Sequence, residues 1–208
     1  MTKTEAGTSW RTYPASGLPP ILETALACFM EYGYHGTAIR TVSSRAELSV
    51  PGLYYHYESK QALLVAVVSY AMDELWARST AALEEAGNDT RRRLDLLVEC
   101  LVLFHAHRRD LAFTAYSEIR SLTGDARTTS IAARDRQQRL MDQVIEDGVA
   151  QGDFVTPYPR EAGRAIVTMC TGVSQWYRAD GEHSPQELAE RYREMTRMTV
   201  GALAAPRP

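Results

Sequence analysis

Apolar residues recur at three- and four-residue steps along most of the chain, which is the period of helices that bury one face. The first such segment begins at Ile21 and stops at Gly33, and the last runs from Ser184 to about Ala204. We count nine helical segments and find no convincing strand. The pattern therefore predicts an all-α protein in which three short helices precede six longer ones, with a long helix from Lys60 linking the two groups.

Residues that favour helix ends mark the boundaries of these segments. Thr37 and Ser49 are placed to cap two short helices, and Ser59 is placed to cap the long one. Ser184-Pro185-Gln186-Glu187 has the composition of a capping box with proline at the first helical position. Breaks are expected at Asn88-Asp89, Thr123-Gly124-Asp125, Phe154-Val155-Thr156-Pro157 and Ala179-Asp180-Gly181. They separate helices expected over 94–105, over 111–122, up to 148–152 and over 159–178.

The composition divides the chain into three parts. Residues 1–17 mix Thr, Ser, Gly and Pro with few large apolar side chains, which is typical of a flexible arm. Residues 18–64 hold the short helices, and residues 65–208 hold the longer ones. A chain of 208 residues is long enough for one small and one larger domain.

Residues 37–56 have the layout of a helix-turn-helix motif. A short helix over 37–45 and another over 50–56 are joined by a turn, and the core between them would consist of Ile39, Val42, Ala46, Leu48 and Leu53. Tyr54, Tyr55 and His56 then have no obvious core role, and such side chains hydrogen-bond phosphates and base edges. The arrangement predicts a second helix that lies in the major groove of DNA.

The stretch 21–68 resembles the N-terminal domain of the TetR family of transcriptional regulators. The shared marks are Ala25, Phe29, Gly33-Tyr34, Thr37, Ala46, Leu48-Ser49 and the block Gly52-Leu53-Tyr54-Tyr55-His56-Tyr57-x-Ser59-Lys60-x-x-Leu63-Leu64. The resemblance implies that operator DNA is contacted by Thr37, Ser49, Val50, Pro51, Gly52, Tyr54, Tyr55, His56 and Lys60. In that family, residues at the positions of Thr37, Tyr54, His56 and Lys60 bind the phosphate backbone.

Two residues depart from the family pattern. Glu47 replaces a glycine that often has a positive φ angle, a conformation that costs another residue type about 1 kcal/mol. Its carboxylate would also oppose nearby phosphates. Ser43 stands where the family usually packs alanine between the two helices. Neither change abolishes the fold.

Charge gives no support to DNA binding, so the case rests on the motif. The formal net charge is −3, and the first 60 residues hold five basic and five acidic side chains. Cys28, Cys100 and Cys170 lie far apart in apolar segments, which is typical of buried free thiols in a reducing cytoplasm. The longest aliphatic run, 63–68, is too short to span a bilayer, and no signal peptide is visible. We expect a cytoplasmic protein with no membrane partner, no cofactor and no metal.

The TetR resemblance implies that the rest of the chain binds a small molecule. Apolar and aromatic residues on four helices would share one interior, and we expect the ligand among Leu101, Phe104, His105, Phe113, Tyr116, Met141, Ile145, Met169, Val173 and Trp176.

The chemical class of that molecule is suggested by a looser resemblance. Residues 174–178, and Tyr116-x-Glu118 ahead of Arg134-x-Arg136, are similar to acyl-CoA-responsive TetR repressors of fatty-acid and sterol breakdown. Val167 and Thr171 stand where that subgroup has charged or bulky residues. An acyl-CoA thioester and a free hydrophobic molecule are the two alternatives. Solvation is expected for Arg120, Arg134, Arg136 and Arg178, rather than contact with CoA phosphates.

The last two helices carry apolar stripes that the resemblance assigns to a homodimer. One stripe is Ala162, Ile166, Cys170 and Val173, and the other is Leu188, Tyr192, Met195, Thr199 and Ala202. A twofold dimer would read a palindromic operator, because one short helix buries too little surface to specify a site.

The resulting hypothesis is a ligand-responsive repressor that its effector releases from DNA, which is the family default. A helical enzyme is the first alternative, but the sequence has no catalytic carboxylate pair, Gly-rich phosphate loop, nucleophilic serine motif or Cys–His constellation. A protein-binding adaptor that has lost DNA binding is the second, and Glu47 and the neutral N-terminal part favour it.

Overall fold

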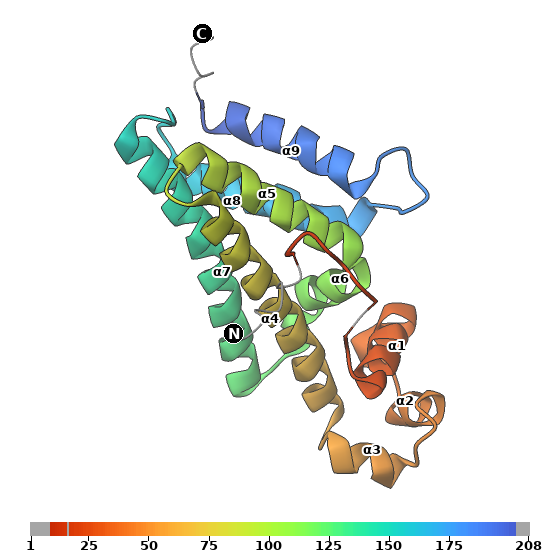
Figure 1. Ribbon diagram of the computed structural model, residues 1–208. Coiled ribbons are helices and arrows are strands. Elements are labelled where there is room, and N and C mark those ends of the chain that lie inside the picture. The colour runs from red at the N-terminus through yellow and green to blue at the C-terminus, as the bar shows by residue number, and fades with distance from the viewer. Residues whose placement is uncertain (1–8, 16, 203–208) are drawn as a thin grey trace, which may run out of the picture.

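The computed structural model describes residues 9–15 and 17–202, and every regular element in this part of the chain is helical (Figure 1). The elements are α1 (Pro20–Gly36), α2 (Ile39–Arg45), α3 (Val50–His56), α4 (Lys60–Ala86), α5 (Thr90–His107), α6 (Arg109–Ser117), the 3-10 helix η1 (Glu118–Ser121), α7 (Gly124–Gln151), α8 (Pro159–Trp176) and α9 (Pro185–Thr199). The predicted all-α class and the nine α-helices are confirmed for the described residues.

Most of the predicted helix starts are confirmed by their caps. The Ser49 and Ser59 hydroxyl oxygens accept the backbone N–H groups of Gly52 and Ala62 at 3.1 and 3.0 Å. Ser184 and Glu187 form the complete capping box at the start of α9. Several ends differ from the prediction: α5 begins earlier, at Thr90, the segment 111–122 divides into α6 and η1, α8 ends at Trp176 and α9 ends at Thr199.

Thr37 does not cap α2, so that prediction is wrong. The N-cap residue of α2 is Ala38, which makes no side-chain cap. Thr37 instead closes the end of α1, where Gly33 has a φ of 69° and interrupts the helix. The Thr37 hydroxyl lies 2.7 Å from the Gly33 carbonyl oxygen and 3.0 Å from that of Cys28, and it donates to these acceptors.

Two hydrophobic cores share the helix α4. The small core is built from α1, α2, α3 and the first half of α4, where Leu63, Leu64 and Val67 are fully buried. Residues from α6 also join this core. The second half of α4 packs in the large core, so a single continuous helix runs from one core into the other (Figure 1).

The large core is centred on α5, which packs against α4, α6, α7, α8 and α9. Every residue of α5 from 100 to 106 is buried. All three cysteines are free and buried, as predicted. Burial raises the pKa of Cys100 to about 12, so this thiol is protonated and unreactive at neutral pH.

The segment 9–14, which we call the N-terminal strap, packs on the larger domain. Trp10 is buried in the large core, and its indole N–H donates to Glu85 at 2.7 Å. Arg11 forms ion pairs with Glu85 and Glu99 at 2.7 and 2.6 Å. The prediction of a flexible arm over 1–17 is therefore wrong for residues 9–14; residues 1–8 and 16 lie outside the described residues. Composition missed the strap because its contacts come from two large aromatic rings and one arginine.

Tyr13 completes the strap. Its ring stacks on His107 with centroids 4.5 Å apart, and the Arg78 guanidinium lies 3.8 Å from its centroid. Arg78 also donates to the carbonyl of Trp10 at 2.6 Å, and Arg108 donates to that of Pro14 at 3.1 Å. The strap is thus held to α4 and α5 through side chains and backbone together.

Among residues 9–15 and 17–202, none of the helices combines the length and the hydropathy that a transmembrane segment requires.

Candidate DNA-binding surface and effector cavity

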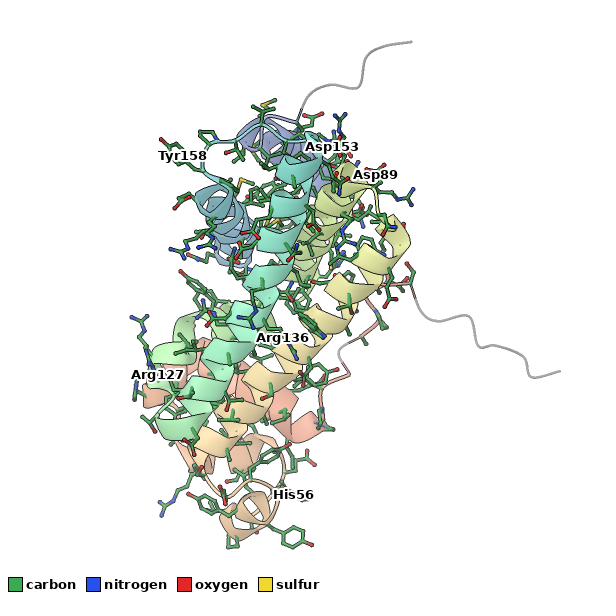
Figure 2. All side chains as sticks on the ribbon, turned by 90° about the vertical axis from the view of Figure 1, so that its left-hand side faces the viewer. His56, Asp89, Arg127, Arg136, Asp153 and Tyr158 are labelled. Carbon is green, nitrogen blue, oxygen red and sulfur yellow. The ribbon has the colours of Figure 1, made fainter. Side chains whose placement is uncertain are left out.

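Helix α3 lies at one end of the molecule, opposite α9 (Figure 1). Leu53 is its one buried residue and anchors it to the small core. Tyr54 and Tyr55 are 45% and 87% exposed, and His56 is also exposed at this end (Figure 2). The prediction that these three side chains have no core role is confirmed, and α3 presents a polar aromatic face to solvent.

The turn before α3 has the positive φ angle that the family pattern predicts at the position of Glu47. Glu47 has a φ of 56°, and within the described residues it is the one non-glycine with a positive φ. Its side chain is exposed. Ser43 is buried between the helices, where its hydroxyl donates to the Arg40 carbonyl at 3.1 Å. Both departures from the family pattern are therefore accommodated, the first at the expense of backbone strain.

Lys60 binds carbonyl groups at the end of α1. Its ammonium donates to the carbonyl oxygens of Tyr34 and Thr37 at 2.8 and 2.9 Å, and to that of His35 at 3.4 Å. It also lies 4.6 Å from the centroid of the Tyr34 ring. The Tyr34 and His35 carbonyls belong to the last turn of α1, which carries the negative end of the helix dipole. Lys60 and the buried Thr37 therefore have structural partners within the chain, and their expected contact with phosphate stays a prediction.

The remaining cations near α3 are few. Arg45 pairs with Glu31 at 2.6 Å and donates to the Tyr32 hydroxyl at 2.9 Å. The hydrogen bond from Arg45 lowers the pKa of Glu31, so this carboxylate stays charged and partly offsets Arg45. Arg40 is exposed on α2. The modest positive charge agrees with the neutral count of the first 60 residues.

A cavity of about 440 Å³ lies in the larger domain, within the usual size range of ligand pockets of about 300–1,000 Å³. Helices α4, α5, α6, α7 and α8 all contribute to its walls. Its apolar lining comes mainly from Ala71, Met72, Leu75, Leu101, Phe104, Ala112, Ala115, Ile119, Ile131 and Val167.

Four of the ten residues predicted to bind a ligand line this cavity: Leu101, Phe104, His105 and Tyr116. The other six are Phe113, Met141, Ile145, Met169, Val173 and Trp176, and placing them in the cavity wall was wrong. Met141, Ile145 and Val173 fill the large core, and Trp176 is 54% exposed at the end of α8.

The position along α7 and the rotation of α8 explain what sequence reasoning missed. On α7 the cavity is lined by Ile131, Arg134 and Gln138, while Met141 and Ile145 lie further along, in the core. On α8 the cavity is lined by Arg164, Val167, Thr168 and Thr171, whereas Val173 is buried in the large core. The position of Gln137 in the sequence could have indicated the cavity. A glutamine on the inward-facing stripe of a helix needs a hydrogen-bond partner, because buried polar groups are nearly always hydrogen-bonded.

Polar groups line the cavity at two depths. His105 and Gln137 are buried, whereas Arg134 is partly exposed and Arg164 exposed, so the arginines lie on the rim. The Arg134 guanidinium is 5.5 Å from the centroid of the Tyr116 ring. Burial lowers the pKa of His105 to about 4, so its imidazole is neutral at physiological pH.

The other arginines considered for CoA phosphates lie elsewhere. Arg136 covers the Trp76 ring at 4.1 Å on the flank of the molecule (Figure 2). Arg120 and Arg178 are exposed, as predicted. Among the described residues, no group of three or more His, Cys, Asp or Glu side chains is placed to hold a metal ion.

The predicted dimer stripes are mostly part of the chain's own core. Ala162, Ile166, Cys170 and Val173 on α8 are buried, and so are Leu188 and Tyr192 on α9. The assignment was wrong for these six residues, because the most apolar face of each helix packs inward, whereas Met195, Thr199 and Ala202 of the second stripe are not buried. The exposed apolar residues of these helices are Trp176, Met195 and Met198, at 54%, 40% and 78%.

Both parts of the chain match models of one protein family. Residues 21–67 match the model described as bacterial regulatory proteins of the tetR family, and residues 87–200 match the tetracyclin repressor-like C-terminal domain. The second match alone spans more than half of the chain.

Individual relatives agree with these matches. The transcriptional repressor KstR2 of Mycobacterium tuberculosis is 26% identical over 174 residues, which are 83% of this chain and 86% of KstR2. A tetR-family regulatory protein from Rhodococcus RHA1 has 28% identity and a TM-score of 0.83, over 89% of this chain and 97% of its own. AibR, solved in complex with isovaleryl coenzyme A and operator DNA, has 22% identity and a TM-score of 0.79, over 88% and 97%.

Proposed function

Because the chain belongs to the TetR family of bacterial transcriptional regulators, we propose that it is a repressor that binds a palindromic operator as a homodimer and releases it when a small amphipathic molecule fills the cavity. One observation carries the proposal: α4 forms part of the cavity wall and is continuous with the helix that builds the core behind α3. The enzyme alternative is set aside by the family match.

The DNA-contacting residues are those that α3 exposes and those of the turn before it. Tyr55 is the most exposed and reads base edges, while Tyr54 and His56 bind phosphates. Ser49, Val50, Pro51 and Gly52 form the N-terminal part of the helix, which approaches the groove. Lys60 acts indirectly, by donating from the start of α4 to the carbonyl oxygens of Tyr34 and Thr37 at the end of α1.

The dimer is formed by α8 and α9 through the faces that the core leaves exposed. Trp176, Met195 and Met198 supply its apolar contacts. Ala165 and Gly172 lie on the solvent side of α8 and allow a partner helix to approach closely. Large exposed apolar side chains on neighbouring helices mark an association surface, and a twofold arrangement gives two copies of α3 for one palindrome.

Release follows from the position of α4. A ligand in contact with Met72 and Leu75 tilts a stiff helix whose other end carries Leu63 and Leu64 of the small core. The two copies of α3 then no longer match major grooves about 34–36 Å apart. A ligand that prefers this state about 100-fold shifts the equilibrium by about 2.7 kcal/mol.

The effector is an acyl-CoA thioester or a related amphipathic anion. The apolar wall suits a hydrocarbon group, and Arg134 and Arg164 on the rim suit an anionic group that stays near solvent. AibR was solved with isovaleryl coenzyme A and has the same fold. A regulator of this kind acts in the cytoplasm, where the DNA is, with no membrane partner.

The test is fluorescence anisotropy with the DNA that flanks the protein's own gene. We expect specific, salt-dependent binding that isovaleryl-CoA or a longer acyl-CoA weakens, while the matched free acids act less strongly. Tyr55→Ala should weaken specific binding by about 1–3 kcal/mol. Tyr158→Ala is the matched control, because this exposed tyrosine lies at the opposite end of the molecule (Figure 2). Equal affinity for this DNA and for random DNA, in both the wild type and Tyr55→Ala, would favour the adaptor instead.

A further inference from the structure

We infer that the effector carries a hydrogen-bond donor, such as a hydroxyl group, on the apolar part that enters the cavity, where His105 and Gln137 present unpaired acceptor atoms. The inference rests on the proposed function, because it assumes that the cavity is the effector site.

His105 contributes the first acceptor. Its side chain is 5% exposed and lines the cavity. Its Nδ1 lies 2.7 Å from the Leu101 carbonyl oxygen. A carbonyl oxygen only accepts, so Nδ1 carries the proton and donates it to Leu101. In the neutral ring Nε2 is then an acceptor, and it has no hydrogen-bond partner among the described residues.

Gln137 contributes the second acceptor. Its side chain is 6% exposed and lines the same cavity. Its amide Nε2 donates to the Ser79 hydroxyl oxygen at 2.8 Å. Ser79 is itself fully buried and lies 3.8 Å from the Cys100 sulfur. The Gln137 Oε1 atom is buried and has no partner within the described chain.

These two acceptors determine which apolar ligands fit. A ligand that packs against these residues must donate hydrogen bonds to the two acceptors or leave them unpaired, which lowers its affinity. A plain hydrocarbon leaves both acceptors unpaired, and a ketone at the same place sets an acceptor against an acceptor. A hydroxyl group donates its hydrogen to one of them. A buried polar group that is left unpaired discriminates strongly between ligands of the same shape.

The rest of the cavity completes the description of the ligand. Leu75, Phe104 and Ile131 surround its skeleton, and Arg134 and Arg164 on the rim fit a carboxylate or the phosphates of coenzyme A. The class is therefore a hydroxylated hydrophobic acid or its CoA thioester.

Calorimetric titration with matched probes tests this. One set pairs ω-hydroxy fatty acids of eight to sixteen carbons with the unsubstituted acids, and the other compares cholanic acid with its 3-hydroxy and 3-oxo derivatives; each compound is used as free acid and as CoA thioester. We expect at least one hydroxylated probe to bind about tenfold or more tightly than its unsubstituted partner, which is 1.4 kcal/mol. The oxo derivative should have no such advantage. Unsubstituted or oxo probes that bind as tightly as the hydroxylated ones throughout both sets would overturn the inference.

Variants connect the preference to the two residues. Gln137→Met and His105→Phe each remove one acceptor with little change of volume, so the hydroxyl advantage should shrink and the unsubstituted probes should bind more tightly than to the wild type. Gln143→Met is the control, because Gln143 is exposed on the same helix and donates to Asp147 at 2.7 Å outside the cavity. If either of the first two variants fails to fold, the other still decides.

Operator release separates this inference from the proposed function. If unsubstituted probes bind and release the operator DNA but hydroxylation brings no gain, the function stands and the inference falls. If no probe binds, or binding leaves operator affinity unchanged, the proposed effector function itself fails.

Discussion

Replacing Lys60 by methionine tests whether this residue stabilises the small domain or contacts DNA. The substitution keeps a long apolar stem and removes the ammonium that donates to the carbonyls of Tyr34 and Thr37 at 2.8 and 2.9 Å. Hydrogen bonds to a charged group contribute about 1.5–3 kcal/mol each, and a cation at a helix C-terminus adds about 0.3–1 kcal/mol. Partial exposure of Lys60 and the rotamer entropy that it regains reduce this sum. We expect a net loss of about 2–3 kcal/mol.

The melting temperature and the salt dependence of operator binding distinguish a structural role of Lys60 from a DNA contact. In a chain of this length about 1 kcal/mol corresponds to a shift in Tm of about 2–4 °C, so Lys60→Met should melt about 4–12 °C below the wild type. Operator affinity, measured from low to moderate salt, should fall while the slope of its logarithm against salt stays the same. A lost phosphate contact would reduce that slope by about 0.9.

Arg40→Met is the matched control. It removes one positive charge from the same domain, and the Arg40 side chain forms no ion pair within the described residues. Its melting temperature should stay within about 2 °C of the wild type, in keeping with the small effect of most surface substitutions. The reasoning is refuted if Lys60→Met melts like the wild type and loses about one phosphate contact from its salt slope.

Three further predictions concern the turn, the cavity and the dimer. Glu47→Gly should leave the melting temperature unchanged or raised, because relief of about 1 kcal/mol of strain offsets the chain entropy of glycine, and it should tighten operator binding; a lower Tm together with weaker binding would contradict this. His105 has its pKa lowered to about 4, against about 6.5 in the unfolded chain, so the unfolded state binds the proton first and stability falls as pH drops below about 6.5. Denaturant titrations should show a loss of about 2 kcal/mol from this group between pH 7 and pH 5, and an unchanged pH dependence in His105→Phe would contradict the assignment. Met198→Asp should give folded monomers by sedimentation, whereas Val173→Asp should unfold the chain because Val173 is fully buried; a dimeric Met198→Asp would move the interface elsewhere.

Local sequence signals predicted much of the fold. The period of apolar residues placed the helices, and Ser49, Ser59 and Ser184 marked three helix starts correctly. These signals succeed because a cap acts on backbone groups two or three residues away. The same logic failed at Thr37, which serves the helix before it because the kink at Gly33 leaves carbonyl oxygens within reach. Local pattern does not tell which of two adjoining helix ends a polar residue serves.

The cavity and the proposed dimer face were harder to predict because they depend on how each helix is rotated and on where along the helix the cavity lies. Neighbouring positions on α8 point in different directions, so Thr171 lines the cavity while Val173 fills the core. The strongest apolar stripe of a helix is the one that packs inside its own domain. The surface left for a partner is less apolar, and residues such as Gly172 carry little signal of their own.

The N-terminal strap makes the DNA-binding domain an insertion rather than an N-terminal module. The chain begins its described course on the larger domain, with Trp10 buried there, crosses to the small core at Leu18, and returns along α4. The strap precedes both ranges that match the family models, which start at residues 21 and 87. A chimera that gives this protein a new operator specificity should therefore replace an internal segment and retain residues 9–14. A fusion that replaces everything before α4 would remove Trp10 and Tyr13 and open the surface of α4 and α5 that they cover.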